Sequence, residues 1–146
     1  MEFEMQENVL TVNDYQKLRT SAGWSELPEQ QIETALKNSL FIIAVKYQEQ
    51  VVAMGRLVGD GCYICYIQDL VVLPEYQGKG IGKYIIERLI SYVREQGIPD
   101  TNITLGLFAA IGKEGFYQKQ GFHIRPNDNR GAGMEIILPV HQDTGA

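Results

Sequence analysis

Residues 71–83 read VVLPEYQGKGIGK, and they predict an apolar strand, a glycine-rich turn and the start of an amphipathic helix. Gly78, Gly80 and Gly82 fall close together, so the backbone can turn sharply and no side chains cover its amides. The first amides of a helix lack partners inside the helix, and the helix dipole adds partial positive charge there. The turn is therefore suited to a phosphate or pyrophosphate, and we expect a phosphorylated ligand.

Two common phosphate-binding loops do not fit this turn. A P-loop ends in Gly-Lys-Ser/Thr, but Tyr84 follows Lys83, and Gln77 stands where the first glycine of that loop belongs. A dinucleotide fingerprint needs its third glycine at Lys83. An NTPase and a Rossmann-type site are thus disfavoured, while a tight turn without a ligand stays an alternative.

The hydrophobic pattern predicts an α/β (α+β) fold with a mixed, mainly antiparallel sheet of six to seven strands flanked by about four helices. Strands are expected over residues 2–9, 41–47, 50–58, 63–73, 103–107, 122–125 and 134–139. Helices are expected from Asn13 or Asp14 to Arg19, from Pro28 to Leu36, from Ile81 to Gly97 and from Ile111 to Gln120. The strand, glycine turn, helix and next strand should form one βαβ crossover.

Length and composition limit how many domains the chain can form and which partners it can bind. A chain of 146 residues with 45% hydrophobic residues fits one domain with a sizeable core, here residues 1–141 before a polar tail at 142–146. The net charge of −5 disfavours nucleic acid and anionic lipid as partners. No apolar run approaches the ~20 residues that span a bilayer, and the acidic start is unlike a signal peptide, so a cytoplasmic location is expected. A homodimer is one open option.

Cys62 and Cys65 have C-x-x-C spacing, but two cysteines cannot build a four-cysteine zinc site. They fall in a segment that reads as a strand, where residues three apart point to opposite faces. We therefore expect two buried thiols that act as small apolar residues, and no metal.

Residues 77–82, QGKGIG, resemble the acyl-CoA loop of the GCN5-related N-acetyltransferases (GNAT), Gln/Arg-x-x-Gly-x-Gly/Ala, at every fixed position. The preceding strand, YIQDLVV at 66–72, is similar to the central strand of that family. Residues 114–122, EGFYQKQGF, resemble its helix-then-strand signature. The resemblance covers most of the chain and is weakest before residue 40.

The resemblance implies an acetyl-CoA-dependent N-acetyltransferase that needs no metal and transfers the acetyl group directly to a primary amine, expected to be a small molecule. Direct attack is favoured because neither cysteine stands at a plausible nucleophile position. Two alternatives stay open. One is a protein acetyltransferase acting on lysine side chains or N-termini, and the other is an acyl-CoA-binding module without turnover.

The resemblance also implies a set of cofactor-binding residues. The pyrophosphate would lie on the turn formed by Gln77, Gly78, Lys79, Gly80, Ile81, Gly82 and Lys83. The pantetheine arm would pair with backbone groups of Leu70 and Val72 and pack against Phe108. One departure is Ala110, which replaces an asparagine that holds the cofactor in many members.

Two residues are expected to donate or accept a proton during the reaction. Tyr117 matches the tyrosine general acid of the family, and an ordinary phenol with a pKa near ~10 carries a proton at neutral pH. Asp69 is a carboxylate inside an apolar strand, and it could bind the acceptor ammonium or accept its proton. The alternatives are a packing role for Tyr117 and backbone bonding at a strand irregularity for Asp69. The expected acceptor-binding residues are Trp24, Glu26, Tyr66 and Gln68.

Overall fold

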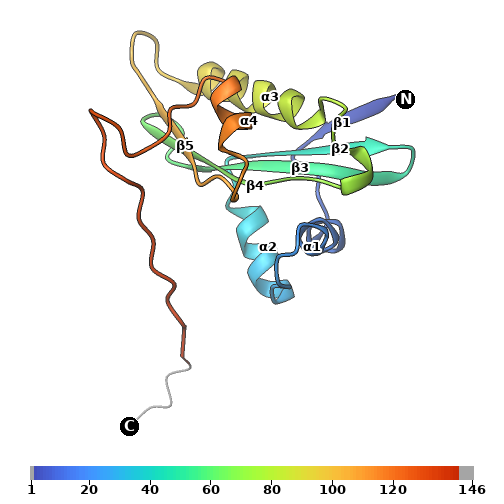
Figure 1. Cartoon of the computed structure of the whole chain (residues 1–146). Coiled ribbons are helices and arrows are strands. Elements are labelled where there is room, and N and C mark those ends of the chain that lie inside the picture. Colours follow the sequence, from blue (N-terminus) through green and yellow to red (C-terminus); the bar gives the residue numbers. More distant parts are fainter. Residues whose placement is uncertain (1, 142–146) are drawn as a thin grey trace. The chain divides into compact units, whose positions relative to one another are not determined.

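The computed structural model describes residues 2–141 (Figure 1). Its strands are β1 (Phe3–Glu7), β2 (Phe41–Tyr47), β3 (Gln50–Gly59), β4 (Ile64–Val72) and β5 (Thr104–Leu107). Its helices are α1 (Val12–Ser21), α2 (Glu29–Lys37), α3 (Ile81–Gln96) and α4 (Glu114–Lys119), with a short 3-10 helix, η1, at Pro74–Tyr76. The chain forms two compact units, which meet in sequence after Phe108.

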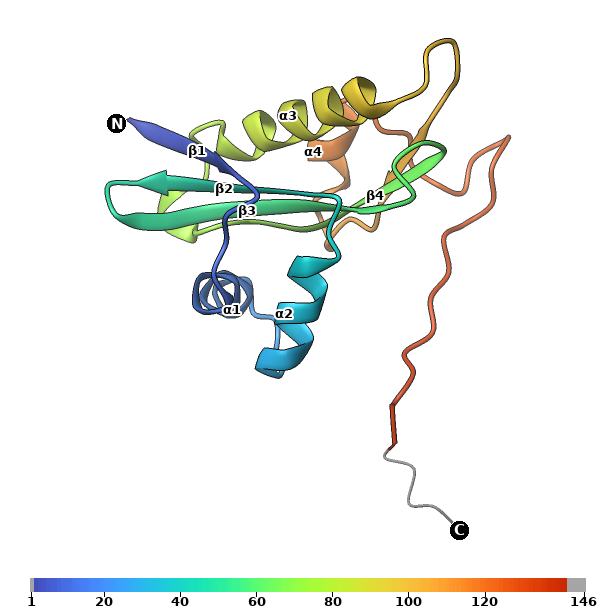
Figure 2. The same ribbon diagram turned by 180° about the vertical axis from the view of Figure 1, so that it is seen from behind.

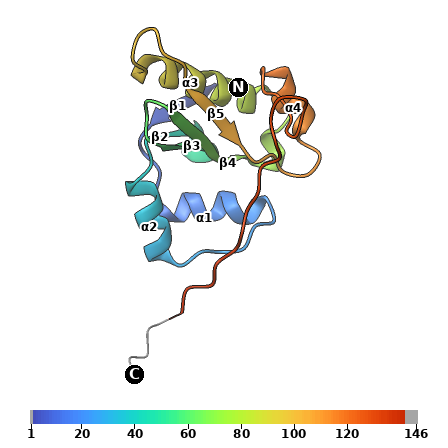
Figure 3. The ribbon, with the colours of Figure 1, turned by 90° about the vertical axis from the view of Figure 1, so that its left-hand side faces the viewer.

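The first unit is built on a sheet with strand order β1-β2-β3-β4-β5. Strands β1 to β4 pair antiparallel, and β5 pairs parallel with β4. Helix α3 connects β4 to β5, so the expected meander and βαβ crossover are both confirmed. Helices α1 and α2 lie on one face of the sheet and α3 lies on the other (Figures 2 and 3).

Apolar residues from the sheet and α3 form the core of this unit. Residues 41–45 of β2 are buried in succession, because helices cover the strand on both faces. Helix α3 buries Ile81, Ile85, Ile86, Leu89 and Val93, which recur at helical spacing. In β3, a Cβ added at Gly55 would lie 2.8 Å from Ile85 Cγ2, so this glycine lets α3 approach the sheet closely.

The start of α1 differs from the expected one. The helix is capped by Thr11, whose Oγ1 accepts a 3.1 Å hydrogen bond from the Asp14 N–H, and neither Asn13 nor Asp14 is the cap. The cap therefore precedes the expected residues, because a hydroxyl at that position reaches the amide three residues later. Helix α2 begins directly after Pro28, as expected.

The second unit differs more from the expected structure. Helix α4 begins at Glu114 rather than Ile111, since Gly112 has a left-handed φ of +82°. Residues 122–125 and 134–139 form no strand, so the sheet has five strands rather than six or seven. An alternating pattern becomes a strand only where a partner strand pairs with it, and no described segment of this unit does.

Two expectations about the ends and borders of the domain remain predictions. The polar tail at 142–146 lies outside the described residues, and the single domain over residues 1–141 stays a prediction. None of the helices among residues 2–141 combines the length and apolar character needed to cross a membrane.

Candidate active site

The glycine-rich turn leads directly into α3. Gly78 and Gly80 adopt left-handed φ angles of +77° and +82°, and Gly80 is the N-cap of α3. A Cβ added at either glycine would meet no atom within 4 Å, so the space above the turn is open. Within α3, Ile81 and Gly82 are among the first residues, whose amides have no partner inside the helix. The turn thus offers an uncovered set of N–H groups to an anion.

The remaining side chains of the turn are placed around this backbone. Gln77 Nε2 donates a 3.1 Å hydrogen bond to the Val72 carbonyl, which ties the turn to the end of β4. Lys79 is exposed, and Lys83 is exposed with its Nζ 3.8 Å from Glu87 Oε1. Both ammonium groups are accessible to a phosphate, and their predicted role in cofactor binding stays a prediction.

Strand β4 has an open edge beside this turn. Strand β5 pairs only with Ile64 to Ile67 of β4, so residues 68–72 have no neighbouring strand on that side in the described structure. The Leu73 N–H donates to the Val52 carbonyl of β3, at 2.8 Å. Because backbone groups alternate in direction along a strand, those of Val72 and Leu70 point away from β3, toward the open edge. This is the edge at which the sequence predicts the pantetheine arm.

A β-bulge interrupts β4 immediately before this edge. The register with β3 shifts between Met54 and Arg56, so Asp69 and Leu70 together stand opposite Gly55. Asp69 has a φ of +59°, which a residue with a side chain rarely adopts. The bulge turns the Asp69 side chain toward Tyr15 of α1.

Asp69 is buried and surrounded by donors. Its Oδ2 accepts hydrogen bonds from Tyr15 Oη at 2.6 Å and from Arg56 Nε at 2.8 Å. Its Oδ1 accepts one from Gln68 Nε2 at 3.2 Å and lies 3.9 Å from Arg19 Nη1. A carboxylate held by a cation and two further donors already has its acceptor sites occupied by groups of the protein itself. These contacts favour a supporting role, and the role of Asp69 as the base stays a prediction.

The same contacts perturb the tyrosine. Burial raises the pKa of the Tyr15 hydroxyl above its ordinary value, and the hydrogen bond and charge of Asp69 raise it further. The guanidinium groups of Arg19 and Arg56 act in the opposite direction on this pKa. Tyr15 is therefore a protonated donor to Asp69 at neutral pH.

Sequence reasoning missed Tyr15, Arg19 and Arg56. A signal was present for Arg56, which is the only charged residue of β3, as Asp69 is the only charged residue of β4. Two lone, opposite charges on adjacent apolar strands favour a pair, because each would otherwise be buried alone. Tyr15 and Arg19 carried no comparable signal, since nothing in α1 indicates which strand its buried side faces.

Three of the predicted acceptor residues contact other named side chains of the first unit. The rings of Tyr66 and Phe108 meet edge to face with centroids 5.3 Å apart. Gln68 contacts Asp69. Trp24 is half-buried in the connection between α1 and α2, with the Arg19 guanidinium 5.5 Å from its ring centroid, while Glu26 in the same connection is exposed. The predicted roles of these residues stay predictions.

Tyr117 belongs to the second unit. It is half-buried in α4, between the rings of Phe116 at 5.1 Å and Phe122 at 6.0 Å. The Phe122 N–H donates to the Tyr117 carbonyl, so the end of α4 fixes this aromatic group locally. The Ala110 carbonyl accepts a hydrogen bond from the Lys113 N–H in a turn before α4. The Ala110 side chain has no hydrogen-bonding group, unlike the asparagine that it replaces.

Cys65 is buried as expected, but Cys62 is exposed, because it lies in the connection before β4, which begins only at Ile64. Burial raises the pKa of the Cys65 thiol, which keeps it protonated and a poor nucleophile. Within residues 2–141, no three His, Cys, Asp or Glu side chains gather in a group that could hold a metal ion. That transfer needs no metal stays a prediction.

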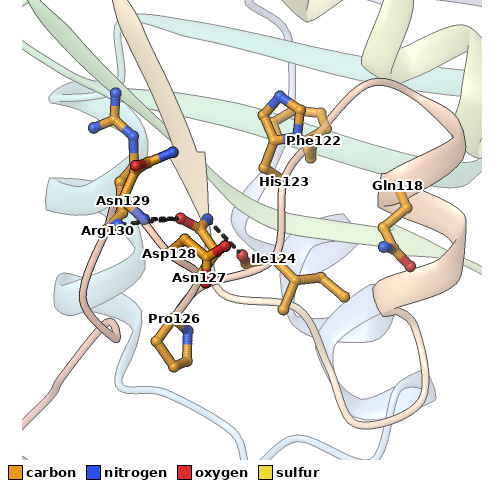
Figure 4. Close-up of a pocket in the computed structure, with 9 residues that line it drawn as sticks. All are labelled: Gln118, Phe122, His123, Ile124, Pro126, Asn127, Asp128, Asn129 and Arg130. Atoms are coloured by element: carbon orange, nitrogen blue, oxygen red, sulfur yellow. Dashed lines mark hydrogen bonds between the residues drawn. The ribbon is translucent and has the colours of Figure 1, made fainter.

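The second unit also contains a surface hollow of about 590 Å³ (Figure 4). It is lined by Gln118, Phe122, His123 and Ile124 and by the loop at residues 126–130. Asn127 organises this loop, since its Oδ1 accepts from the Asn129 and Arg130 amides and its Nδ2 donates to the Ile124 carbonyl. The polar groups of Asn127 are thus used within the loop, and none of the predicted site residues lines the hollow.

The known proteins to which this chain is similar are described as acetyltransferases. The model of the "Acetyltransferase (GNAT) family" matches residues 9–122. A curated relative from Prochlorococcus marinus, an uncharacterized ycf52-like N-acetyltransferase, is 31% identical over 129 residues, covering 86% of this chain and 69% of the relative. Histone acetyltransferase TAP1 from Glycine max is 33% identical over 131 residues, covering 82% of this chain and 55% of that protein.

A solved structure from meticillin-resistant Staphylococcus aureus, described as a protein of unknown function and probable acetyltransferase, has a TM-score of 0.82 and 29% identity. The match covers 94% of this chain and 100% of that one.

Proposed function

Because the chain belongs to the acetyltransferase (GNAT) family and is an acetyl-CoA-dependent acetyltransferase, we propose that it acetylates a small primary amine by direct transfer. The observation that carries the proposal is the open edge of β4 beside the uncovered glycine turn. One surface of the first unit thus offers N–H groups for phosphates and, at residues 68–72 of β4, a strand edge without a neighbouring strand in the described structure.

The residues of this surface fit acetyl-CoA, which supplies an acetyl group activated as a thioester. The turn from Gly78 to Gly82 would hold the pyrophosphate through its amides, and Lys79 and Lys83 would add positive charge. Leu70 and Val72 would pair their backbone groups with the pantetheine amides, as an added strand does. An N–H at this edge would polarise the thioester carbonyl.

Transfer requires a neutral amine, which attacks the carbonyl carbon as the bond between that carbon and sulfur breaks. The amine gives up one proton to solvent, Tyr117 gives its phenol proton to the departing sulfur, and the resulting phenolate takes a proton back from solvent. In this proposal, Asp69 and its partners hold the bulge that aims the β4 edge.

A protein acceptor is the second candidate, and one observation favours it. The soybean relative carries the name histone acetyltransferase, and that substrate class belongs to that protein. The net charge of −5 also allows contact with a basic peptide.

One experiment separates these functions. The purified chain is incubated with acetyl-CoA and either a panel of small amines or a set of lysine-containing peptides, and released thiol is measured. Thiol release with small amines alone supports the proposal. Release with peptides alone supports the second candidate. Binding of CoA without thiol release in any mixture identifies a binding module and contradicts both.

A further inference from the structure

The charges around the β4 bulge do not balance. Two guanidinium groups, from Arg19 and Arg56, face the single carboxylate of Asp69, which leaves a formal excess of one positive charge. Within residues 2–141, no other carboxylate forms an ion pair with either arginine. The side chains of Arg19 and Arg56 are only 14% and 12% exposed, so water neutralises this excess poorly.

The two arginines differ in how closely they contact Asp69. Arg56 bonds Asp69 through Nε at 2.8 Å and reaches Ser39 Oγ through Nη1 at 3.1 Å, which fixes it as the partner of Asp69. Arg19 stays 3.9 Å from Asp69 Oδ1, beyond a direct hydrogen bond. Arg19 therefore carries the charge that the cluster does not neutralise.

Arg19 is nonetheless held in place. Its Nε donates a 3.0 Å hydrogen bond to the Ser25 carbonyl, and its guanidinium lies 5.5 Å from the centroid of the Trp24 ring. Both contacts come from the connection between α1 and α2, so they orient the guanidinium without neutralising it. A planar, pre-oriented guanidinium with remaining N–H groups is suited to bind a carboxylate through two parallel hydrogen bonds.

The location connects this cation to the reaction. Arg19 lies beside Asp69, and Asp69 directly precedes Leu70, whose backbone faces the open edge proposed for the acetyl donor. A group bound by Arg19 would therefore lie close to the acetyl group. We propose that Arg19 binds a carboxylate of the acceptor, so that the acceptor is an amine that also carries a carboxylate. This inference rests on the proposed function and specifies its substrate class.

The test uses matched pairs of amines that differ only in a carboxylate or a carboxamide, with thiol release as the readout. We expect wild type to favour the carboxylates in kcat/KM by about 10- to 100-fold, the value of one charge-assisted pair. Arg19→Gln should abolish this preference, because it should raise KM for the carboxylates at least tenfold more than KM for the matched carboxamides. Lys17→Gln is the control, because it removes the same charge from an exposed position of α1.

Three results would contradict the inference while leaving the proposed function intact. These are equal kcat/KM for both members of each pair, a preference for the carboxamides, and a carboxylate preference that survives Arg19→Gln. If no amine of either kind releases thiol, the proposed function itself fails, and the inference fails with it. Folding of each variant is checked by thermal unfolding before the kinetics are compared.

Discussion

Arg56 Nε donates a hydrogen bond of 2.8 Å to Asp69 Oδ2 and so joins the only charged residue of β3 to the only charged residue of β4. The Asp69 and Arg56 side chains are 2% and 12% exposed, so each would be a buried, uncompensated charge without the other. This pair, with Tyr15, braces the bulge at the point where β4 opens toward the proposed acetyl donor. The effects that we expect from substitutions at Asp69 and Tyr15 follow from these contacts.

Asp69→Asn should lower the free energy of unfolding by about 3 kcal/mol, because Arg56 is left as a buried cation without its counter-charge. Denaturant unfolding measures this loss. The double variant Asp69→Asn with Arg56→Gln should lose clearly less than the sum of the two single variants, since the pair is removed together. Normal stability combined with a large fall in kcat would instead identify Asp69 as the base.

Tyr15→Phe should cost about 1.5–3 kcal/mol, the value of a hydrogen bond to a charged group. The wild-type protein should also lose stability as the pH rises above the ordinary tyrosine value of 10.0, because the pKa of Tyr15 is raised in the folded state. In that window the unfolded chain releases the proton first, so unfolding is favoured, whereas below it both states are protonated and the contribution is constant.

The measurement is the difference in unfolding free energy between wild type and Tyr15→Phe at neutral pH and above pH 10. This difference should shrink at the higher pH. A difference that grows with pH would contradict a raised pKa.

Gly55→Ala should destabilise the fold by about 1–3 kcal/mol, because the new methyl group would lie 2.8 Å from Ile85 Cγ2 and push α3 from the sheet. Gly106→Ala is the matched control in another strand, since its nearest atom would be Tyr66 Cδ2 at an ordinary 3.9 Å. Thermal unfolding of both variants tests the packing of α3. Equal melting temperatures for the two variants would show that the packing is looser than described.

Gly80→Asp should weaken acetyl-CoA binding at least tenfold, since it strains a left-handed position and places a negative charge on the proposed phosphate site. Gly61→Asp is the control: it adds the same charge at a φ of +80°, at the other end of β4. Isothermal calorimetry with acetyl-CoA compares the two. Equal affinity in both folded variants would remove the glycine turn from the cofactor site.

Tyr117→Phe keeps the ring contacts with Phe116 and Phe122 and removes only the hydroxyl. If Tyr117 protonates the departing sulfur, kcat should fall by about 10²–10⁴-fold with little change in acetyl-CoA affinity. Single-turnover thiol release measures the chemical step. A fall below about threefold in that step would assign Tyr117 to packing.

The parts of the fold that local patterns determine were predictable. Strand β2 has the expected bounds, and α3 follows the glycine turn, because apolar periodicity and glycines act over a few residues. The length of α4 was overestimated, since a left-handed Gly112 was not expected before it. The expected strands at 122–125 and 134–139 depend on a pairing partner, which a local pattern does not supply.

The direction in which the Asp69 side chain points could not be predicted from the sequence, for a geometric reason. Cys65 lines a small cavity with Tyr92 and Val93 of α3, and strict alternation would place Asp69 on that same face. The bulge shifts the alternation by one residue and turns the carboxylate to α1, where Tyr15 and Arg19 lie. The bulge itself has no glycine or proline in β4 that would indicate it.

The central claim is that this chain moves an acetyl group from acetyl-CoA to a small amine at the β4 edge and glycine turn. The most direct measurement follows released thiol and acetylated amine together, by absorbance and mass spectrometry, for wild type and Gly80→Asp. The account predicts equal amounts of both products with wild type and a loss of both with Gly80→Asp. Acetyl-CoA binding without either product for any amine, or an unchanged rate with Gly80→Asp, would contradict it.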